Sequence, residues 1–387
     1  MDAPGGRNTV IDFWRGLVLV VIFVNHVPGN ILEHLTPRNY GFSDAAEAFV
    51  FISGLSVALV YYPRLPQGDI FGVFRQCLRR SLELYRMHLI MTGVAIALFS
   101  IGYVLSDEVA LIEAHGRNMV FGDTARGITG VLLLGHQLGY FNILPLYIAL
   151  MLWAPVAMLL MRIHMAVAIA VSIGIYILAR ADILAFPSWP EPGHWFFNPF
   201  AWQLLFTTGI AVGALLTRQD VPYLRASFAS SIIILGVSFV IMTEGFGLAH
   251  GLLWGAFNDL DIIKSDLGLG RLVHFLALAY VLTQLRLGQM VQGTIFGREM
   301  MRLGRYGLPV FAVGSILSAL GEVIMTLAAV KSSASPHIVG MIFTLFGILG
   351  LLILARYLEW KKKGSIAPRP ERAVELGLAS ASGRFPR

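Results

Sequence analysis

Residues 10–62 read VIDFWRGLVLVVIFVNHVPGNILEHLTPRNYGFSDAAEAFVFISGLSVALVYY, and this stretch decides how the rest of the chain is interpreted. Two apolar runs, 17–24 and 48–62, flank a polar junction. Apolar runs of this kind are typical of membrane helices, and ionisable groups at membrane depth are costly and often functional. The junction is therefore the first candidate site. Its polar residues are an amide, two imidazoles, a guanidinium and three carboxylates: Asn25, His26, Glu33, His34, Arg38, Asp44 and Glu47.

The composition of the whole chain indicates a membrane protein. Of 387 residues, 56% are hydrophobic and 13% are charged, whereas soluble domains have about 25% charged residues. A spanning helix needs roughly 20 mostly apolar residues, so the run 128–138 is too short. We predict ten spans, at 10–28, 45–62, 79–104, 141–162, 165–180, 199–216, 227–243, 271–285, 307–328 and 338–358. The expected fold is all-α and polytopic, with one transmembrane domain over 1–360 and a disordered cytoplasmic tail over 361–387.

The distribution of basic residues predicts the orientation. If the ten spans alternate and the N-terminus is cytoplasmic, 22 of the 29 Lys and Arg residues fall on the cytoplasmic side. This is the positive-inside pattern, so the net charge of +6 reports topology rather than a nucleic-acid partner. Both termini are then expected in the cytoplasm, and the junction faces outward. The acidic outer loop 244–271 has no compact metal-ligand spacing, so we predict no metal site.

A basic cluster stands at the start of the third predicted span. It consists of Arg75, Arg79, Arg80 and Arg86. One interpretation is an ordinary cytoplasmic anchor for the helix. The other is a phosphate-binding entrance, because several guanidinium groups on one helix face suit a polyphosphate such as coenzyme A.

Polar and aromatic residues also gather in the segments expected to face outward. Beside Asn25, the candidates for substrate contact are His136, Gln137, Trp195, Asn198, Trp202 and Gln203. Trp and Tyr at an outer interface usually anchor a protein at the membrane–water boundary. Because aromatic rings also stack on sugar faces, the same residues are a candidate surface for a glycan acceptor.

Four stretches resemble one family of membrane proteins. They are RNTVIDFWRGLVLVVIFVNHVPGN at 7–30, HLTPRNYGFSDAAEAFVFISG at 34–54, LLLGHQLGYFNILPLY at 132–147 and WFFNPFAWQLLFTTG at 195–209. They resemble the OpgC-type glucan-modifying proteins of Gram-negative bacteria, within a wider superfamily of acyltransferase 3-like membrane proteins. The resemblance fades after residue 360. It implies about ten helices and transfer of an acyl group, succinyl in OpgC-like members, from cytoplasmic acyl-CoA to a periplasmic glucan or a related glycan.

The resemblance also implies a catalytic histidine. In this superfamily a histidine near the outer end of the first helix is catalytic, and here that position holds His26. The same superfamily includes a branch of lysosomal heparan acetyltransferases. In that branch the histidine lies further along the chain, at a spacing that falls on His34 here. The acetyltransferase branch has an Arg-x-x-Arg motif at the start of helix 3. At that spacing this chain has Arg80 and then Glu83, so it departs from the motif.

Acyl transfer from a thioester to a hydroxyl requires a base that removes the alcohol proton. Histidine titrates near neutrality and is the natural base, and Asp44 or Glu47 could orient it. No Ser or Cys occurs in a nucleophile-elbow motif, so we favour direct transfer over an acyl-enzyme. We expect a membrane-embedded O-acyltransferase with His26 as the general base and His34 as the alternative.

The expected donor is acyl-CoA, either succinyl-CoA or acetyl-CoA, and no permanently bound cofactor is expected. The other expected partners are a periplasmic glycan and the lipid bilayer of the bacterial inner (cytoplasmic) membrane, and the oligomeric state stays open. A transporter or flippase for a glycan or lipid-linked sugar would also have polar residues at helix breaks, but it more often shows inverted repeats. A structural or sensor protein would not need clustered His, Asp and Glu.

Overall fold

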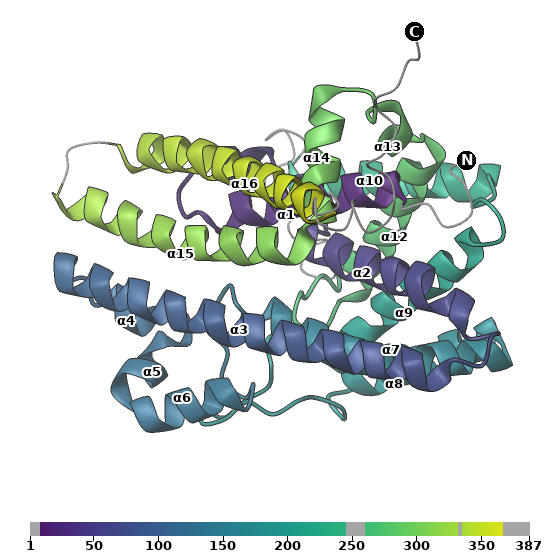
Figure 1. The fold of residues 1–387 in the computed structure, drawn as a ribbon, viewed down its shortest axis with the longest axis horizontal. Coiled ribbons are helices and arrows are strands. Elements are labelled where there is room, and N and C mark those ends of the chain that lie inside the picture. The colour runs from purple at the N-terminus through teal and green to yellow at the C-terminus, as the bar shows by residue number, and fades with distance from the viewer. Residues whose placement is uncertain (1–7, 245–259, 332–334, 367–387) are drawn as a thin grey trace, which may run out of the picture.

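The structure, a computed structural model, describes residues 8–244, 260–331 and 335–366, and every regular element in these ranges is helical (Figure 1). Ten helices correspond to the ten predicted spans: α1 (Thr9–His26), α2 (Ala45–Tyr61), α3 (Ile70–Ser106), α7 (Ile143–Ile163), α8 (Met165–Arg180), α9 (Pro199–Leu216), α10 (Arg225–Met242), α12 (Leu269–Gln284), α15 (Gly307–Lys331) and α16 (Pro336–Ile366). Eight are long and apolar enough to cross a membrane, and α8 and α12 are shorter apolar helices. The prediction of an all-α polytopic membrane protein is confirmed.

Short helices connect the long ones. The α-helical ones are α4 (Ala110–Glu113), α5 (Arg117–Gly122), α6 (Thr124–Leu132), α13 (Leu287–Met290) and α14 (Ile295–Arg305), and the 3-10 helices are η1 (Ile31–Leu35), η2 (Pro37–Asn39), η3 (Tyr62–Arg64) and η4 (Ala114–Gly116). The helices α4, α5 and α6 lie together near one end of α3, at the lower left of Figure 1. With 9 residues, α6 is too short to span, as expected for this segment.

Two predicted boundaries differ from the structure by more than three residues. α3 begins at Ile70, well before the predicted residue 79, because the Asp69 side chain caps it by accepting a hydrogen bond from the Gly72 N–H at 3.1 Å. The polar residues that follow continue the helix beyond the apolar run on which the prediction rests. α16 continues to Ile366, so the first residues of the tail predicted at 361–387 are helical. Residues 367–387 lie outside the described residues.

Local signals fix the ends of the two helices that flank the junction. The Asn8 side chain accepts hydrogen bonds from two backbone N–H groups, at 3.1 and 3.2 Å, and so begins α1. The helix ends before Pro28 and Gly29, and Gly29 has a φ of 68°, which glycine adopts without strain. α2 begins with a capping box, in which Asp44 accepts from a backbone N–H at 2.7 Å and Glu47 accepts from the Asp44 N–H at 2.8 Å.

Glycines let both of these helices pack backbone against backbone. A Cβ on Gly54 of α2 would lie 2.2 Å from a carbonyl oxygen of α9. A Cβ on Gly304 of α14 would lie 1.8 Å from the carbonyl oxygen of Asp12, and Gly16 of α1 faces α14 in the same way. Small residues at such crossings allow close packing of membrane helices. The position of the junction is therefore set by contacts of α1 with α14 and of α2 with α9.

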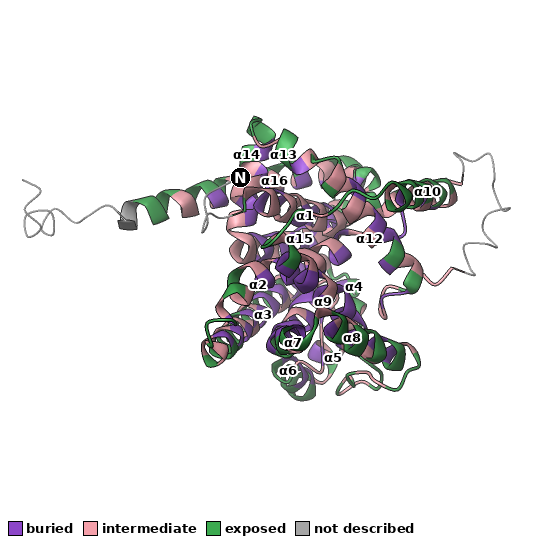
Figure 2. Ribbon diagram, turned by 90° about the vertical axis from the view of Figure 1, so that its right-hand side faces the viewer, coloured by how far each residue is buried: buried purple, intermediate pink, exposed green. Residues whose placement is uncertain are grey.

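The long helices form a bundle with its buried residues concentrated in the middle. Figure 2 looks along the bundle and shows α1, α9 and α15 near its centre and α10 at its edge. The largest buried side chains include Phe23, Trp202 and Phe206. In contrast, only Ser231 and Ser238 of α10 are buried, as expected of a helix that faces lipid.

Candidate functional site

A cavity of about 450 Å³ lies at the C-terminal end of α1. We call it the junction cavity. Its wall combines the end of α1, the starts of α2 and α7, and several loops. The polar and aromatic residues that line it are Asn25, His26, Glu33, Arg38, Asp44, His115, Tyr140, Asn142, Phe196, Phe197, Lys264 and Phe311. The fold thus joins the predicted junction to segments that are remote from it in the sequence.

His26 is the last residue of α1 and lies in the wall of the junction cavity. The centroid of its imidazole is 4.9 Å from that of the Tyr140 ring, with 53° between the ring planes. The packed helix fixes the backbone of His26, and the neighbouring ring restricts the imidazole. His26 therefore has the rigid placement that a general base requires.

Asp44 and Glu47 belong to a cluster of four charges. Lys264 Nζ donates to an oxygen of Asp44 at 2.6 Å, and Arg271 Nη2 lies 3.2 Å from the same oxygen. Arg271 Nε donates to Glu47 at 2.7 Å, and Glu47 is fully buried. Burial acts to raise the pKa of Asp44, but the charges of Lys264 and Arg271 outweigh it and hold that pKa below its ordinary value. Asp44 therefore stays an anion.

This cluster bears on how the two carboxylates relate to His26. Asp44 lines the same cavity as His26 and lies close enough for its charge to act on the imidazole. Glu47 does not line the cavity, and its carboxylate holds Arg271 and the first turn of α2. Orientation of His26 by Asp44 or Glu47 stays a prediction, with Asp44 the better placed of the two.

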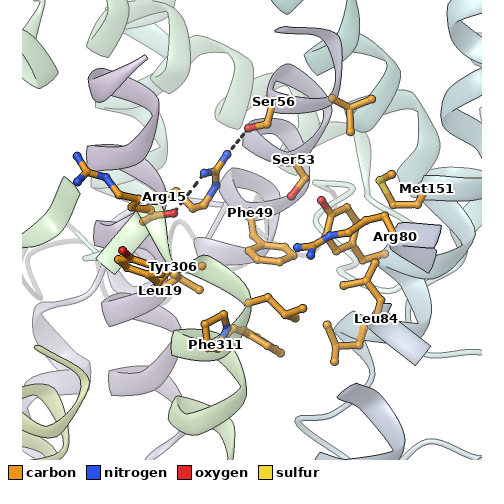
Figure 3. A pocket seen from close by; sticks show the side chains of 18 of the residues that line it. Arg15, Leu19, Phe49, Ser53, Ser56, Arg80, Leu84, Met151, Tyr306 and Phe311 are labelled. Carbon is orange, nitrogen blue, oxygen red and sulfur yellow. Dashed lines mark hydrogen bonds between the residues drawn. The ribbon is translucent and has the colours of Figure 1, made fainter. Parts of the chain in front are cut away.

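A second cavity, of about 350 Å³, lies beside the middle of α1 (Figure 3). We call it the arginine cavity, because Arg15, Arg80 and Arg305 line it. Arg15 donates to the Ser56 hydroxyl and pairs with Asp12 at 3.2 Å, a contact that their i, i+3 spacing on α1 allows. Three cationic side chains from three different helices therefore line one cavity, whose wall is otherwise mostly apolar.

The predicted donor-binding arginines differ in their position relative to the arginine cavity. Arg80 lines it and also pairs with Glu83 at 3.0 Å. Arg75, Arg79 and Arg86 are exposed and lie outside its wall. These three point elsewhere because α3 is a single continuous helix, so residues at different positions around it face different directions. Two arginines from α1 and α14 complete the wall instead.

Phe311 of α15 belongs to the walls of both cavities. Its ring centroid is 5.8 Å from that of Phe49, and the Phe49 ring is 5.7 Å from that of Tyr147. Figure 3 shows Phe49 and Phe311 at the arginine cavity. The arginine cavity and the junction cavity are therefore neighbours that share an aromatic side chain in their walls.

Several predicted substrate-contact residues have structural roles. His136 Nε2 donates to the Gly116 carbonyl at 2.7 Å. Trp202 is fully buried, and its Nε1 donates to the Ser265 carbonyl at 3.0 Å. Gln203 is buried and donates to a backbone carbonyl of α8 at 2.8 Å. None of these three lines the junction cavity, and direct substrate contact by them stays a prediction.

The remaining predicted site residues differ in whether they line the junction cavity. Asn198 caps α9 by accepting from a backbone N–H at 3.1 Å, and Gln137 donates to a backbone carbonyl at 3.2 Å. Trp195 stacks on another aromatic ring, with 4.9 Å between centroids. These three lie outside the wall of the junction cavity, whereas Asn25 is part of it. His34 is exposed in η1 and does not line the cavity either.

Sequence reasoning did not assign four residues that the structure brings to the site or its support. They are His115, Tyr140, Lys264 and Arg271. For the two cations a signal exists, because basic residues are depleted on the outward side of a positive-inside protein. A cation there is a candidate partner for a buried carboxylate. His115 and Tyr140 carry no such local signal.

The fold and the site define a polytopic membrane protein with two adjacent cavities, each lined in part by charged residues, inside its helix bundle. A family model described as OpgC protein matches residues 7–363 of the chain. The chain belongs to this OpgC family, and membership indicates a membrane-embedded transferase of the OpgC type. Neither the curated proteins nor the solved structures include a significant match.

Proposed function

We propose that this protein transfers an acyl group from cytoplasmic acyl-CoA to a hydroxyl of a periplasmic glucan or a related glycan. The observation that carries the proposal is the pair of cavities that share Phe311 in their walls. A donor held in one cavity and an acceptor held in the other would meet inside the protein, away from both aqueous compartments.

The arginine cavity suits the donor. Its three guanidinium groups, from Arg15, Arg80 and Arg305, provide charged donors of the kind that bind phosphate groups. Arg15 and His26 are separated by eleven residues of α1, or about 16 Å along the helix axis. A ligand that places phosphate at Arg15 and its reacting carbonyl near His26 must therefore be long and thin. An extended phosphopantetheine arm has this shape.

The junction cavity suits the acceptor. In the orientation that the positive-inside pattern predicts, this end of α1 faces the periplasm. The cavity offers uncharged polar groups from Asn25, Tyr140 and Asn142, and aromatic rings from Phe196 and Phe197. Hydroxyl groups and the apolar faces of a sugar ring can use both kinds of surface.

His26 is the proposed general base. Its imidazole accepts the proton of the attacking hydroxyl, and the oxygen forms a bond to the thioester carbonyl carbon. The tetrahedral intermediate then expels the thiolate, which takes the proton from the imidazolium, so that the products are an ester and a free thiol. Such a base contributes about 100- to 10,000-fold in rate. Succinyl as the acyl group and the bacterial inner membrane as the location follow from the resemblance to OpgC-type proteins.

The test uses purified protein in liposomes, with labelled succinyl-CoA and a glucose oligosaccharide. We expect free coenzyme A to be released. For each thiol released, one labelled acyl group should become attached to the sugar. Movement of the sugar across the bilayer without thioester cleavage would instead indicate a transporter. A His26→Ala variant at matched folding provides the control for contaminating activity.

A further inference from the structure

Two residues of the junction cavity have a left-handed backbone that costs free energy for any side chain with a Cβ. His115 has a φ of 57° and Tyr140 a φ of 71°, and both line the cavity. Glycine, or to a lesser degree asparagine, adopts this conformation more readily than a bulky side chain does. Strained residues persist where the surrounding structure holds them and gather at binding and catalytic sites.

The two strained turns are held against each other. The Gly139 N–H donates to the His115 carbonyl at 2.9 Å, and a Cβ on Gly139 would lie 2.7 Å from the Cβ of His115. His136 Nε2 fixes the next carbonyl, that of Gly116, at 2.7 Å. The turn at 115–116 and the segment 136–140 are thereby joined into one unit, which we call the support.

A buried ion pair anchors the same support to the bundle. Arg117, which follows the strained turn, donates to Glu322 of α15 at 2.7 Å. Its guanidinium also lies 4.0 Å from the centre of the Phe99 ring in α3. The Arg117 side chain is 2% exposed. The turn that carries His115 is therefore fixed relative to α3 and α15, and through α15 to Phe311.

The support presents its two side chains to the proposed base. The Tyr140 ring lies between two imidazoles, with its centroid 4.9 Å from that of His26 and 4.9 Å from that of His115. Both side chains line the junction cavity, where His115 is exposed and Tyr140 is half-buried. Burial raises the pKa of Tyr140 above its usual value, and the Glu322 carboxylate adds to the effect, so the hydroxyl keeps its proton and can donate a hydrogen bond.

We propose that His115 and Tyr140 bind the acceptor sugar and place one of its hydroxyls at His26. The proposal rests on the proposed function for the identity of the acceptor. The Tyr140 hydroxyl and the His115 ring nitrogens can each form a hydrogen bond with a sugar hydroxyl, and the Tyr140 ring adds an aromatic face. A ring with several hydroxyls matches this arrangement, and because the Tyr140 ring contacts that of His26, its hydrogen bond selects which hydroxyl reaches the base. Both are positioning residues and take no part in bond making.

A purely structural role would predict other residues at these positions. If His115 and Tyr140 served only to close a turn, a residue tolerant of positive φ would serve better. The observed side chains instead combine an unfavourable backbone with exposure to the cavity. His115→Asn is therefore expected to leave the melting temperature unchanged or to raise it, while it weakens the interaction with the acceptor.

The experiment measures sugar binding and catalysis separately. Titration calorimetry with a glucose oligosaccharide is expected to show at least tenfold weaker binding for His115→Asn and for Tyr140→Phe than for the original protein. With succinyl-CoA present, the acceptor KM should rise by a similar factor while the donor KM stays constant. A larger share of the thioester should also be hydrolysed by water instead of acylating the sugar. NMR of the product should show that Tyr140→Phe acylates a mixture of hydroxyls.

A matched control is His194→Asn. His194 is also an exposed histidine near the outward-facing loops, but it does not line the cavity, so its sugar binding should be unchanged. Equal sugar binding by all three variants and the original protein, or no binding by the original protein, would overturn the inference. Sugar binding that depends on His115 without any thioester cleavage would contradict the proposed function and leave the inference standing.

Discussion

Phe311 faces both cavities of this protein, and its ring centroid lies 5.8 Å from that of Phe49. This aromatic contact lies where the arginine cavity and the junction cavity adjoin. A transferase that uses a thioester must keep water from competing with the acceptor hydroxyl. The size of the side chain at Phe311 should therefore affect the fate of the acyl group.

Phe311→Ala is expected to increase acyl-CoA hydrolysis in the absence of sugar, because the aromatic barrier becomes smaller. The protein should also lose stability, by about 3–5 kcal/mol for a buried phenylalanine. The control is Phe275→Ala, since Phe275 and Phe311 are 5% and 4% exposed and Phe275 lines neither cavity. Thiol release without acceptor and the melting temperature are measured for both. Equal hydrolysis by the two variants would show that Phe311 is no barrier.

Arg80→Gln and Arg305→Gln are each expected to raise the donor KM about tenfold, since loss of a charged hydrogen bond of about 1.4 kcal/mol corresponds to that factor. The turnover rate at saturating donor should change little, because contacts far from the reacting carbonyl act equally on the ground and transition states. Arg79→Gln is the control, because Arg79 is exposed on the same helix and does not line the cavity. A larger effect of Arg79 than of Arg80 would place the donor elsewhere.

His26→Ala is expected to lower transfer by about 100- to 10,000-fold, the usual contribution of a general base. His34→Ala should have little effect, because His34 is exposed and lies outside the junction cavity. Glycan acylation is compared at matched amounts of folded protein in the membrane. Normal activity of His26→Ala together with an inactive His34→Ala would assign the base to His34.

The sequence was sufficient for features that depend on neighbouring residues. The ten spans follow from hydrophobicity, and the placement of His26 follows from the apolar run that ends beside it. The capping role of Asp44 likewise follows from its position before α2. The long polar start of α3 could not be predicted in this way, because no apolar run marks these first turns of the helix.

Partner choice over long distances could not be read from the sequence. Trp202 and Gln203 have the side chains of a sugar-binding surface, but the packing of α9 inside the bundle buries both. Lys264 belongs to an acidic loop, and only the folded chain shows that it pairs with Asp44. A residue type limits what a side chain can do, whereas helix packing decides which neighbours it has.

Asp44→Asn is expected to destabilise the protein by about 2–3 kcal/mol, somewhat less than the 3–5 kcal/mol for a fully buried pair, because Lys264 is 35% exposed. The folded-state pKa of Asp44 is below its unfolded value of about 3.9. Its stabilisation is therefore complete above the unfolded pKa and is lost as the pH falls through the lower folded value. The difference in melting temperature between the two proteins should stay constant from about pH 5 to 8 and shrink at more acidic pH.

The control for this prediction is Asp123→Asn. Asp123 also caps a helix and pairs with an arginine, but the Arg126 side chain is 70% exposed and the pair distance is 3.6 Å. An exposed pair of this kind contributes about 0–1 kcal/mol. Because asparagine also caps helices, a similarly small loss of stability in the two variants would show that the ion pairs of Asp44 contribute no more than an exposed pair.

Lys264 follows Asp44 by 220 residues, and this separation has a consequence for biosynthesis. A ribosome that has delivered α1 and α2 to the membrane has not yet made the cations that neutralise Asp44 and Glu47. Chains enter the bilayer from the N-terminus onward, so the two carboxylates must wait for α12 before they gain their counter-charges. A nascent chain released before residue 264 would keep unpaired acidic groups in its first hairpin. The charge cluster can therefore form only after Lys264 and Arg271 have been made, late in the synthesis of the chain.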